Sequence, residues 1–217
     1  MPFGIVNLIA VLLGLLVAIT IHEFSHALVA RQLGDPTAER MGRLSLNPLV
    51  HLDPLGTLMM VITALTGFGI GWGKPTPVSP WNLRPGRRLG MALVAAGGPI
   101  SNFLLALILS AILRLVPIWP GVLASVVSGV ALLNLSLAAF NLLPLPMLDG
   151  FHILMGLITS IRARWAYSLS YQLERLEPQG SMLLLILILA GYVFRFNLLT
   201  MLTFPIFRLL VRVVGMG

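Results

Sequence analysis

Two histidines and a glutamate lie within one short segment of the chain, in the order His22-Glu23-Phe24-Ser25-His26. On an α-helix, residues four positions apart project from the same face, so both imidazoles can bind one metal ion. The neighbouring Glu23 is placed to take a proton from a water activated by that metal. Zinc suits such a site, because it lowers the pKa of bound water and three protein ligands leave a fourth position open. The pattern predicts a catalytic zinc site with Glu23 as general base.

The alternative is that these residues occur together by chance or serve a purely structural purpose. They lie in a nearly continuous apolar run from Pro2 to Val29. An ionisable side chain inside a membrane helix costs about 3 kcal/mol on insertion scales. A cluster of such side chains must be compensated, and a shared metal ion is the simplest compensation, so the metal site is the preferred interpretation.

A third protein ligand must come from elsewhere, and Asp149 is the best candidate. It follows a proline-interrupted segment, Asn141 to Pro146, and broken helices are tolerated in a membrane only where they line a cavity or pack in protein. The alternative is that Asp149 caps the helix that follows it. His152 would share a helical face with Asp149 and is a rival ligand, although a supporting or surface role suits it better.

Three further polar residues are candidates for supporting roles. The amides of Asn102 and Asn141 could hold a substrate backbone and stabilise the oxyanion of a tetrahedral intermediate without adding charge. The alternative for both is hydrogen bonding between helices. His51 lies in a polar loop near the expected mouth of the site, where it is either auxiliary to the chemistry or a simple loop histidine.

The composition indicates that membrane helices position these residues. Of the 217 residues, 58% are hydrophobic and only 10% are charged, against about 25% charged in soluble domains. The net charge of +7 would suit nucleic acid, but basic loops between apolar runs are what the positive-inside rule produces, so no nucleic-acid partner is expected. The absence of cysteine excludes disulfides and thiolate metal sites.

The predicted fold class is an all-α polytopic membrane protein, a bundle of roughly four to six transmembrane helices with short extended or re-entrant segments near the cytoplasmic side. The chain forms one expected domain, 1–217, with a core over 1–160 and C-terminal membrane segments over 181–217. The clear spans are Pro2–Val29, Leu89–Val116, which Gly97-Gly98-Pro99 interrupts, and Val122–Leu143. Leu55–Ile70 and Met182–Phe194 are short for spans, Arg43–Leu46 is expected to be extended, and Gly150–Glu177 is expected to be amphipathic.

Basic residues set the expected orientation of the chain. The loops 31–53, 71–88 and 161–175 hold ten of the fourteen basic residues and are assigned to the cytoplasm. This assignment places both the histidine cluster and Asp149 near the cytoplasmic ends of their helices, at the same depth. An integral multi-pass protein of a prokaryotic cytoplasmic membrane, with its active site near the cytoplasmic side, is the expectation.

The chain resembles the site-2 protease family over residues from about 10 to 155. The resemblance rests on the joint occurrence of three motifs: His22-Glu23-x-x-His26, Gly98-Pro99-x-x-Asn102 and Asn141-x-x-Pro144-x-Pro146-x-Leu148-Asp149-Gly150. Two further segments are similar to the compact prokaryotic branch that lacks PDZ and CBS domains: Asn47-Pro48-x-x-His51-x-Asp53-Pro54-x-Gly56 and Gly73-Lys74-Pro75-Thr76-Pro77-Val78.

The resemblance implies an intramembrane zinc metalloprotease with one zinc ion per chain, held by His22, His26 and Asp149, and with Glu23 as general base and acid. Asn102 and Asn141 would bind the substrate or its transition state. The implied partner is the lipid bilayer together with a single-span membrane protein, cut within its transmembrane segment after local unwinding. The oligomeric state, the substrate and the cleavage position are not implied.

Other membrane functions fit the residues less well. A zinc transporter would need ligands along a path through the membrane, and the chain has one cluster. A di-iron desaturase would need many histidines, and the chain has four. A rhomboid-like serine protease would need a glycine-flanked nucleophilic serine with a paired histidine. The protease interpretation is therefore retained.

Overall fold

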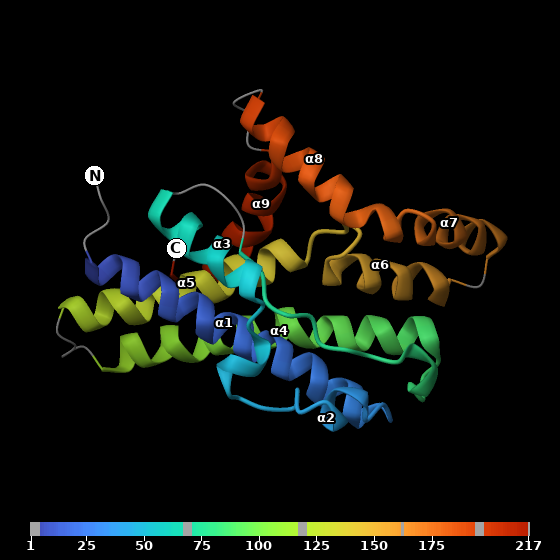
Figure 1. The fold of residues 1–217 in the computed structure, drawn as a ribbon, viewed down its shortest axis with the longest axis horizontal. Helices are drawn as coiled ribbons and strands as arrows, with labels where there is room; N and C mark the ends of the chain where they lie inside the picture. The colour runs from blue at the N-terminus through green and yellow to red at the C-terminus, as the bar shows by residue number, and fades with distance from the viewer. Residues whose placement is uncertain (1–4, 67–70, 117–120, 162, 194–197, 217) are drawn as a thin grey trace.

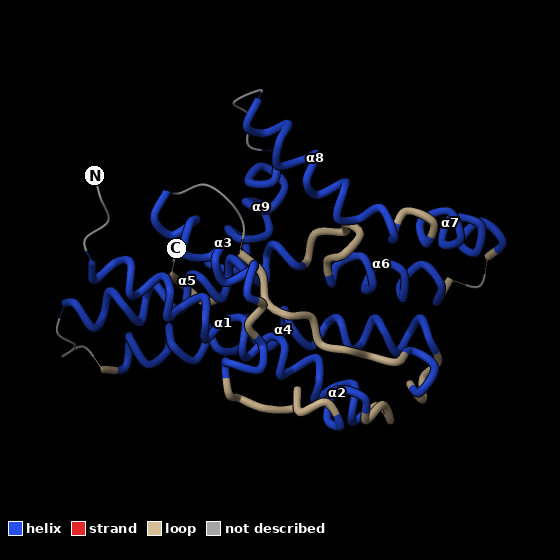
Figure 2. The backbone as a smooth tube through the Cα atoms, viewed as in Figure 1, coloured by secondary structure: helices blue, strands red, loops and turns tan. Residues whose placement is uncertain are grey.

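The computed structural model describes residues 5–66, 71–116, 121–161, 163–193 and 198–216, and within these ranges the chain is helical with no β-strand (Figure 2). Four helices build the core, namely α1 (Ile5–Gln32), α4 (Arg87–Leu115), α5 (Gly121–Asn141) and α6 (Asp149–Ser160). Helix α4 lies at the centre and packs against the other three (Figure 1). The expected all-α fold class is confirmed.

Among the residues that the structure describes, three helical segments are long and apolar enough to cross a membrane: Ala10–Gln32 of α1, α4 and α5. Helices α8 (Gly180–Val193) and α9 (Leu198–Val213) are shorter, with 14 and 16 residues. Any further spans of the expected four to six would have to come from such short helices. The chain is a multi-pass membrane protein.

Helix α3 (Pro54–Thr66) occupies most of the apolar segment 55–70, which was expected to be short for a span. Its 13 residues give a length of about 20 Å, which is shorter than the roughly 30 Å of a hydrocarbon core. It packs against α1 (Figure 1). The end of the expected segment, 67–70, lies outside the described residues.

The structure differs from the sequence-based expectation in two local respects. Helix α4 runs through Gly97-Gly98-Pro99 without a break. Pro99 removes one backbone donor from the helix, but membrane helices tolerate proline where neighbouring helices pack closely around it, and α4 has such neighbours. The expected extended segment at 43–46 is a series of bends, and the described loops contain only an isolated antiparallel bridge between Leu52 and Gly73.

The polar segments that connect α1 to α4 are held against the end of α1 by the buried carboxylate of Asp35. They include α2 (Thr37–Arg40), η1 (Pro48–His51) and η2 (Pro80–Asn82). Asp35 is fully buried and accepts hydrogen bonds from Ser79 N at 2.6 Å and Asn82 Nδ2 at 3.0 Å, as well as from Thr37. Burial alone would raise the pKa of Asp35, but these hydrogen bonds outweigh it and lower the pKa. Asp35 thus attaches the 79–82 segment to α1.

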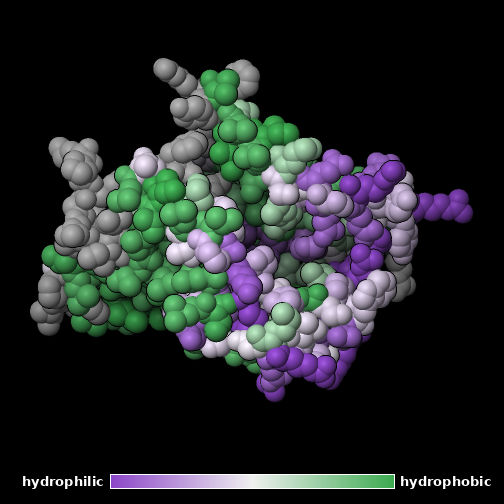
Figure 3. Space-filling view, viewed as in Figure 1, coloured by the Kyte–Doolittle hydropathy of each residue, from purple (hydrophilic) through white to green (hydrophobic). Residues whose placement is uncertain are grey.

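The amphipathic stretch expected at Gly150–Glu177 divides into two helices with different roles. Helix α6 belongs to the core, because Phe151 and Met155 are buried. Helix α7 (Arg164–Glu174) lies outside α6 and is tied to α4 by two hydrogen bonds from Arg88 to Glu174, at 2.9 and 3.1 Å. Figure 3 shows hydrophilic surface around α7 and α2, and hydrophobic surface over α5 and α8.

Candidate metal centre

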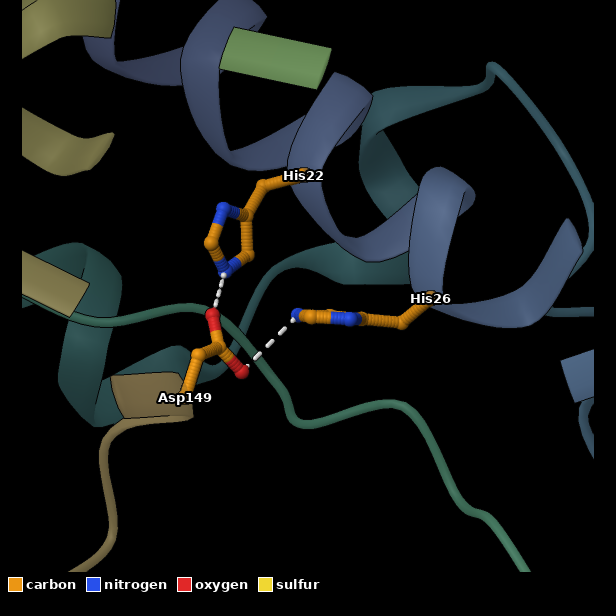
Figure 4. A group of neighbouring side chains, drawn as sticks. All are labelled: His22, His26 and Asp149. Atoms are coloured by element: carbon orange, nitrogen blue, oxygen red, sulfur yellow. Dashed lines mark ion pairs between the residues drawn. The ribbon is translucent and has the colours of Figure 1, made fainter. Parts of the chain in front are cut away.

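Three side chains from two distant segments converge beside α4. His22 and His26 project from one face of α1 toward Asp149, the first residue of α6 (Figure 4). His22 Nε2 lies 3.0 Å from Asp149 Oδ2, and His26 Nε2 lies 3.4 Å from Asp149 Oδ1. The two imidazole rings are perpendicular, with centroids 4.6 Å apart. One ligand atom from each residue lies within 4.8 Å of the others, so the group can hold a single metal ion.

The tautomer of His26 follows from its hydrogen bond to the backbone. Its Nδ1 lies 2.8 Å from the Val94 carbonyl oxygen. A carbonyl can only accept a hydrogen bond, so Nδ1 must carry the proton, and in the neutral ring Nε2 then has a free electron pair. That pair points at the Asp149 carboxylate, where a metal ion would lie between them.

The tautomer of His22 is set by two asparagines. Asn102 Nδ2 donates to the Ala18 carbonyl at 2.9 Å and to Asn134 Oδ1 at 2.7 Å. These two acceptors fix the orientation of the Asn102 amide, so its oxygen faces His22. This Oδ1 lies 2.6 Å from His22 Nδ1 and must accept from it. His22 Nε2 is therefore also left with a free pair, in the arrangement that orients metal-bound histidines in general.

The chemistry of the three donors fits zinc. Two imidazole nitrogens and a carboxylate oxygen are ligands that zinc accepts. Asp149 Oδ2 is buried without a hydrogen-bond partner among the described residues, so this oxygen is available to a metal ion. A carboxylate binds a metal ion in its ionised form.

Close backbone packing brings Asp149 to this position. A Cβ atom on Gly150 would lie 2.3 Å from the Leu142 carbonyl oxygen and 2.4 Å from that of Leu143. Only glycine allows the start of α6 to approach the end of α5 this closely. The turn between them contains Met147 with φ of +81°, a conformation that non-glycine residues rarely adopt. Asp149 makes no side-chain cap of α6, although capping was the alternative to metal binding.

Gly98 allows α4 to approach the two imidazoles. A Cβ atom there would lie 2.5 Å from Cε1 of His22 and 2.6 Å from Nε2 of His26, and real Cβ contacts essentially never come so close. We expect Gly98→Ala to displace both rings and to lower zinc affinity at least tenfold, as loss of ring orientation does in other zinc sites. Zinc retention during titration with a competing chelator measures the effect.

Gly129→Ala is the matched control, because Gly129 lies within α5 and an added Cβ would meet nothing within 4 Å. The control is expected to bind zinc as the wild type does. Equal zinc affinity of the Gly98 and Gly129 variants would show that the rings do not require the space at Gly98.

Asn102→Leu is expected to lower zinc affinity about 10- to 100-fold, the usual effect of removing a group that orients a metal-bound histidine. The substitution keeps a side chain of similar size but removes the acceptor for His22 Nδ1. The same chelator titration measures it. An affinity within twofold of the wild-type value would contradict the orienting role of Asn102.

Glu23 lies one residue from His22, and its carboxylate contacts a loop. Thr76 donates to Glu23 Oε2 from its backbone N at 2.8 Å and from its hydroxyl at 2.7 Å. Within the described chain, no hydrogen bond reaches Oε1. Thr76 thus holds one carboxylate oxygen of Glu23, and the other accepts no hydrogen bond from the described residues.

The remaining predicted site residues lie outside the ligand group. Asn141 donates from Nδ2 to the Leu137 carbonyl of its own helix at 3.1 Å. His51 is fully buried, and its Nε2 donates to the Ser45 carbonyl at 2.7 Å. His152 Nε2 faces Glu177 at 3.9 Å, in a polar pocket between α4, α6 and α7. Roles for Asn141 and His51 stay predictions, whereas the structure gives His152 a neighbour other than the metal group.

Three residues that support the site were given no role by the sequence. Asn134 is a polar residue within the apolar helix α5, and this contrast is the feature of the sequence that could have drawn attention to it. Gly98 and Thr76 lie in segments that carried the family resemblance, but spacing alone does not reveal which atoms they approach. All three act through contacts between segments distant in sequence.

Comparison with known proteins identifies the family. The model of peptidase family M50 matches residues 119–188. YwhC of Bacillus subtilis is 39% identical over 180 residues, which cover 79% of this chain and 76% of the relative. Rip2 of Mycobacterium tuberculosis is 37% identical over 147 residues, 66% of this chain and 55% of Rip2. Both relatives carry the name "Putative zinc metalloprotease", and no solved structure gives a significant match.

The match to YwhC extends over most of both chains, and two of the motifs that carried the resemblance, the histidine motif and the Leu148-Asp149-Gly150 motif, meet in one group of donors. The resemblance found in the sequence is thereby confirmed. The chain belongs to peptidase family M50, the site-2 proteases, and is a zinc metalloprotease of the membrane.

Proposed function

We propose that this protein hydrolyses a peptide bond within the transmembrane segment of a single-span membrane protein. The observation that carries the proposal is the placement of the His22, His26 and Asp149 group among membrane helices, where these side chains are largely buried. A protease that acted on soluble peptides would not need its catalytic group on an apolar helix that can cross the bilayer. Residues 1–217 act as a single protease domain in this proposal.

Each residue of the group has a defined role in the proposed reaction. His22, His26 and Asp149 hold one zinc ion, which when bound supplies Lewis acidity and a lowered pKa for water. Glu23 takes a proton from the attacking water at its free Oε1 and returns it to the nitrogen of the departing amine. Asn141 binds the substrate or the developing oxyanion, while Asn102 acts through His22.

We place the active site near the cytoplasmic face of a prokaryotic cytoplasmic membrane. Helix α1 extends from the hydrophobic side of the molecule toward the hydrophilic side, and its histidines lie in the C-terminal half of the helix. The loops on the hydrophilic side carry most of the basic residues, and basic loops remain in the cytoplasm. A substrate helix would have to unwind at this depth to expose a peptide bond.

The test uses purified protein in liposomes with a single-span model substrate whose membrane segment contains helix-destabilising residues. Mass spectrometry of the products locates the cut. We expect the wild-type protein to cut within the membrane segment and the His22→Ala variant not to cut at all. Cleavage only in the soluble flanks of the substrate would contradict intramembrane proteolysis while leaving the metalloprotease assignment intact.

A further inference from the structure

The loop that crosses the catalytic carboxylate contains a residue with no assigned role. Thr76 places two donors on a single oxygen of Glu23, its backbone N at 2.8 Å and its hydroxyl at 2.7 Å from Oε2. We propose that Thr76 is a positioning residue that fixes the carboxylate of Glu23 for proton transfer. The proposal rests on the proposed function, in which Glu23 is the general base.

The prolines on both sides of Thr76 explain why its backbone donor is available. A residue that precedes proline is restricted to extended conformations, which keeps Thr76 out of any helical turn. Pro75 and Pro77 have no N–H groups. Thr76 therefore supplies the one backbone donor between positions 75 and 77, and Glu23 accepts it.

A buried arginine anchors this loop. Arg43 is only 5% exposed, and its guanidinium donates to the carbonyls of Val50, Lys74 and Pro75, the last at 3.2 Å. The Lys74 backbone N also donates to the His51 carbonyl at 2.8 Å. Hydrogen bonds to backbone atoms of Lys74 and Pro75 thus hold the residues that immediately precede Thr76. The position of Thr76 relative to Glu23 is therefore fixed.

Close packing against α1 also limits the movement of the loop. A Cβ atom on Gly73 would lie 2.6 Å from a methyl group of Ile19 and 3.9 Å from Cγ of Glu23. Gly73 also forms the isolated bridge with Leu52. The loop therefore passes directly over the turn of α1 that carries the catalytic carboxylate.

The two Thr76 donors on Oε2 restrict the orientation of the Glu23 carboxylate. A glutamate side chain has several rotatable bonds, and a free carboxylate would sample many orientations. Holding Oε2 leaves Oε1 as the free proton acceptor and restricts where it can lie. The Thr76 hydroxyl is also 3.0 Å from the Glu23 backbone carbonyl, but the carboxylate is the stronger acceptor. Misplacement of a catalytic group by about 1 Å can cost a hundredfold in rate.

The proposal is tested with Thr76→Val, which removes the hydroxyl but keeps the size and the backbone N–H. The rate of cleavage is measured on the single-span model substrate, together with zinc content and thermal stability. We expect kcat to fall roughly tenfold, with KM and zinc content unchanged, since one of the two donors remains. Thr76→Ser, which restores the hydroxyl, should return kcat to within about twofold of the wild-type value.

Thr57→Val is the matched control, because the Thr57 hydroxyl is buried without a hydrogen-bond partner in the described structure. It should leave kcat unchanged. If Thr76→Val lowers thermal stability more than this control does, Thr76→Ala replaces it, and the same fall in kcat with full zinc content is expected.

The outcomes separate the two proposals. If Glu23→Gln is inactive and Thr76→Val cleaves at the wild-type rate, Glu23 is the base but Thr76 does not position it. A faster Thr76→Val enzyme would also overturn the positioning role, because the contact would then restrain Glu23 from its reaction. If Glu23→Gln cleaves at the wild-type rate, Glu23 is not the general base, and its role in the proposed function fails whatever Thr76 does.

Discussion

Glu23→Gln is expected to lower the rate of proteolysis about 10²- to 10⁴-fold while leaving zinc bound. The amide keeps the size of the side chain but cannot accept a proton from water, so only the proton-transfer step is lost. General acid–base catalysis contributes about 10²- to 10⁴-fold in enzymes, and loss of cleavage within that range is the expected result. Initial rates on the single-span model substrate measure it.

Zinc content of the same Glu23→Gln sample serves as the control. Because Glu23 is outside the ligand group, the variant should retain the zinc content of the wild-type protein. Cleavage at the wild-type rate would show that Glu23 is not the base. Loss of both zinc and activity would instead place Glu23 in the metal-binding group.

Asp149→Ala is expected to release zinc. The carboxylate faces both imidazoles, at 3.0 and 3.4 Å, and its removal leaves two nitrogen ligands. Loss of a group that merely orients a ligand costs about 10- to 100-fold in metal affinity, so loss of a ligand should exceed about 100-fold. Titration of zinc-loaded protein with a chelator of known affinity measures the change.

His152→Ala is the control for this experiment, because His152 was the rival for the third ligand position. In the structure its Nε2 faces Glu177 rather than the imidazoles of α1. The variant should keep wild-type zinc affinity. Unchanged affinity in Asp149→Ala combined with loss in His152→Ala would reverse the assignment.

The ligand group could be predicted from the sequence because polar residues are conspicuous in an apolar chain. His22 and His26 are four residues apart, a spacing that places both side chains on one face of a helix. Asp149 was one of few carboxylates at a suitable depth. The structure brings these three together. The long helices α1, α4 and α5 were predictable for the same reason, since uninterrupted apolar runs of this length cross membranes.

Contacts between segments could not be predicted in the same way. The sequence left both substrate binding and hydrogen bonding between helices open for Asn102, and in the structure its amide hydrogen-bonds to His22, Ala18 and Asn134. In a helix that is apolar on all sides, periodicity does not show which face meets a neighbour. The continuous course of α4 through Pro99 likewise depends on packing, which the local sequence does not encode.

The orientation of Glu23 illustrates the same limit. Its proximity to His22 follows from the sequence, but the donors on Oε2 come from a loop 53 residues away. Arg43 holds this loop in place, because its guanidinium donates hydrogen bonds to carbonyls in two separate loops. Such contacts become visible only in the folded chain.

The most direct test of the metal site is the zinc content of detergent-purified protein, measured by mass spectrometry for the wild type and for a His22→Ala/His26→Ala double variant. We expect about one zinc ion per chain in the wild type, as a single group of three ligands implies, and none in the double variant when both proteins are equally folded. Folded wild-type protein without zinc, or a double variant that retains it, would contradict the assignment of the metal to these histidines.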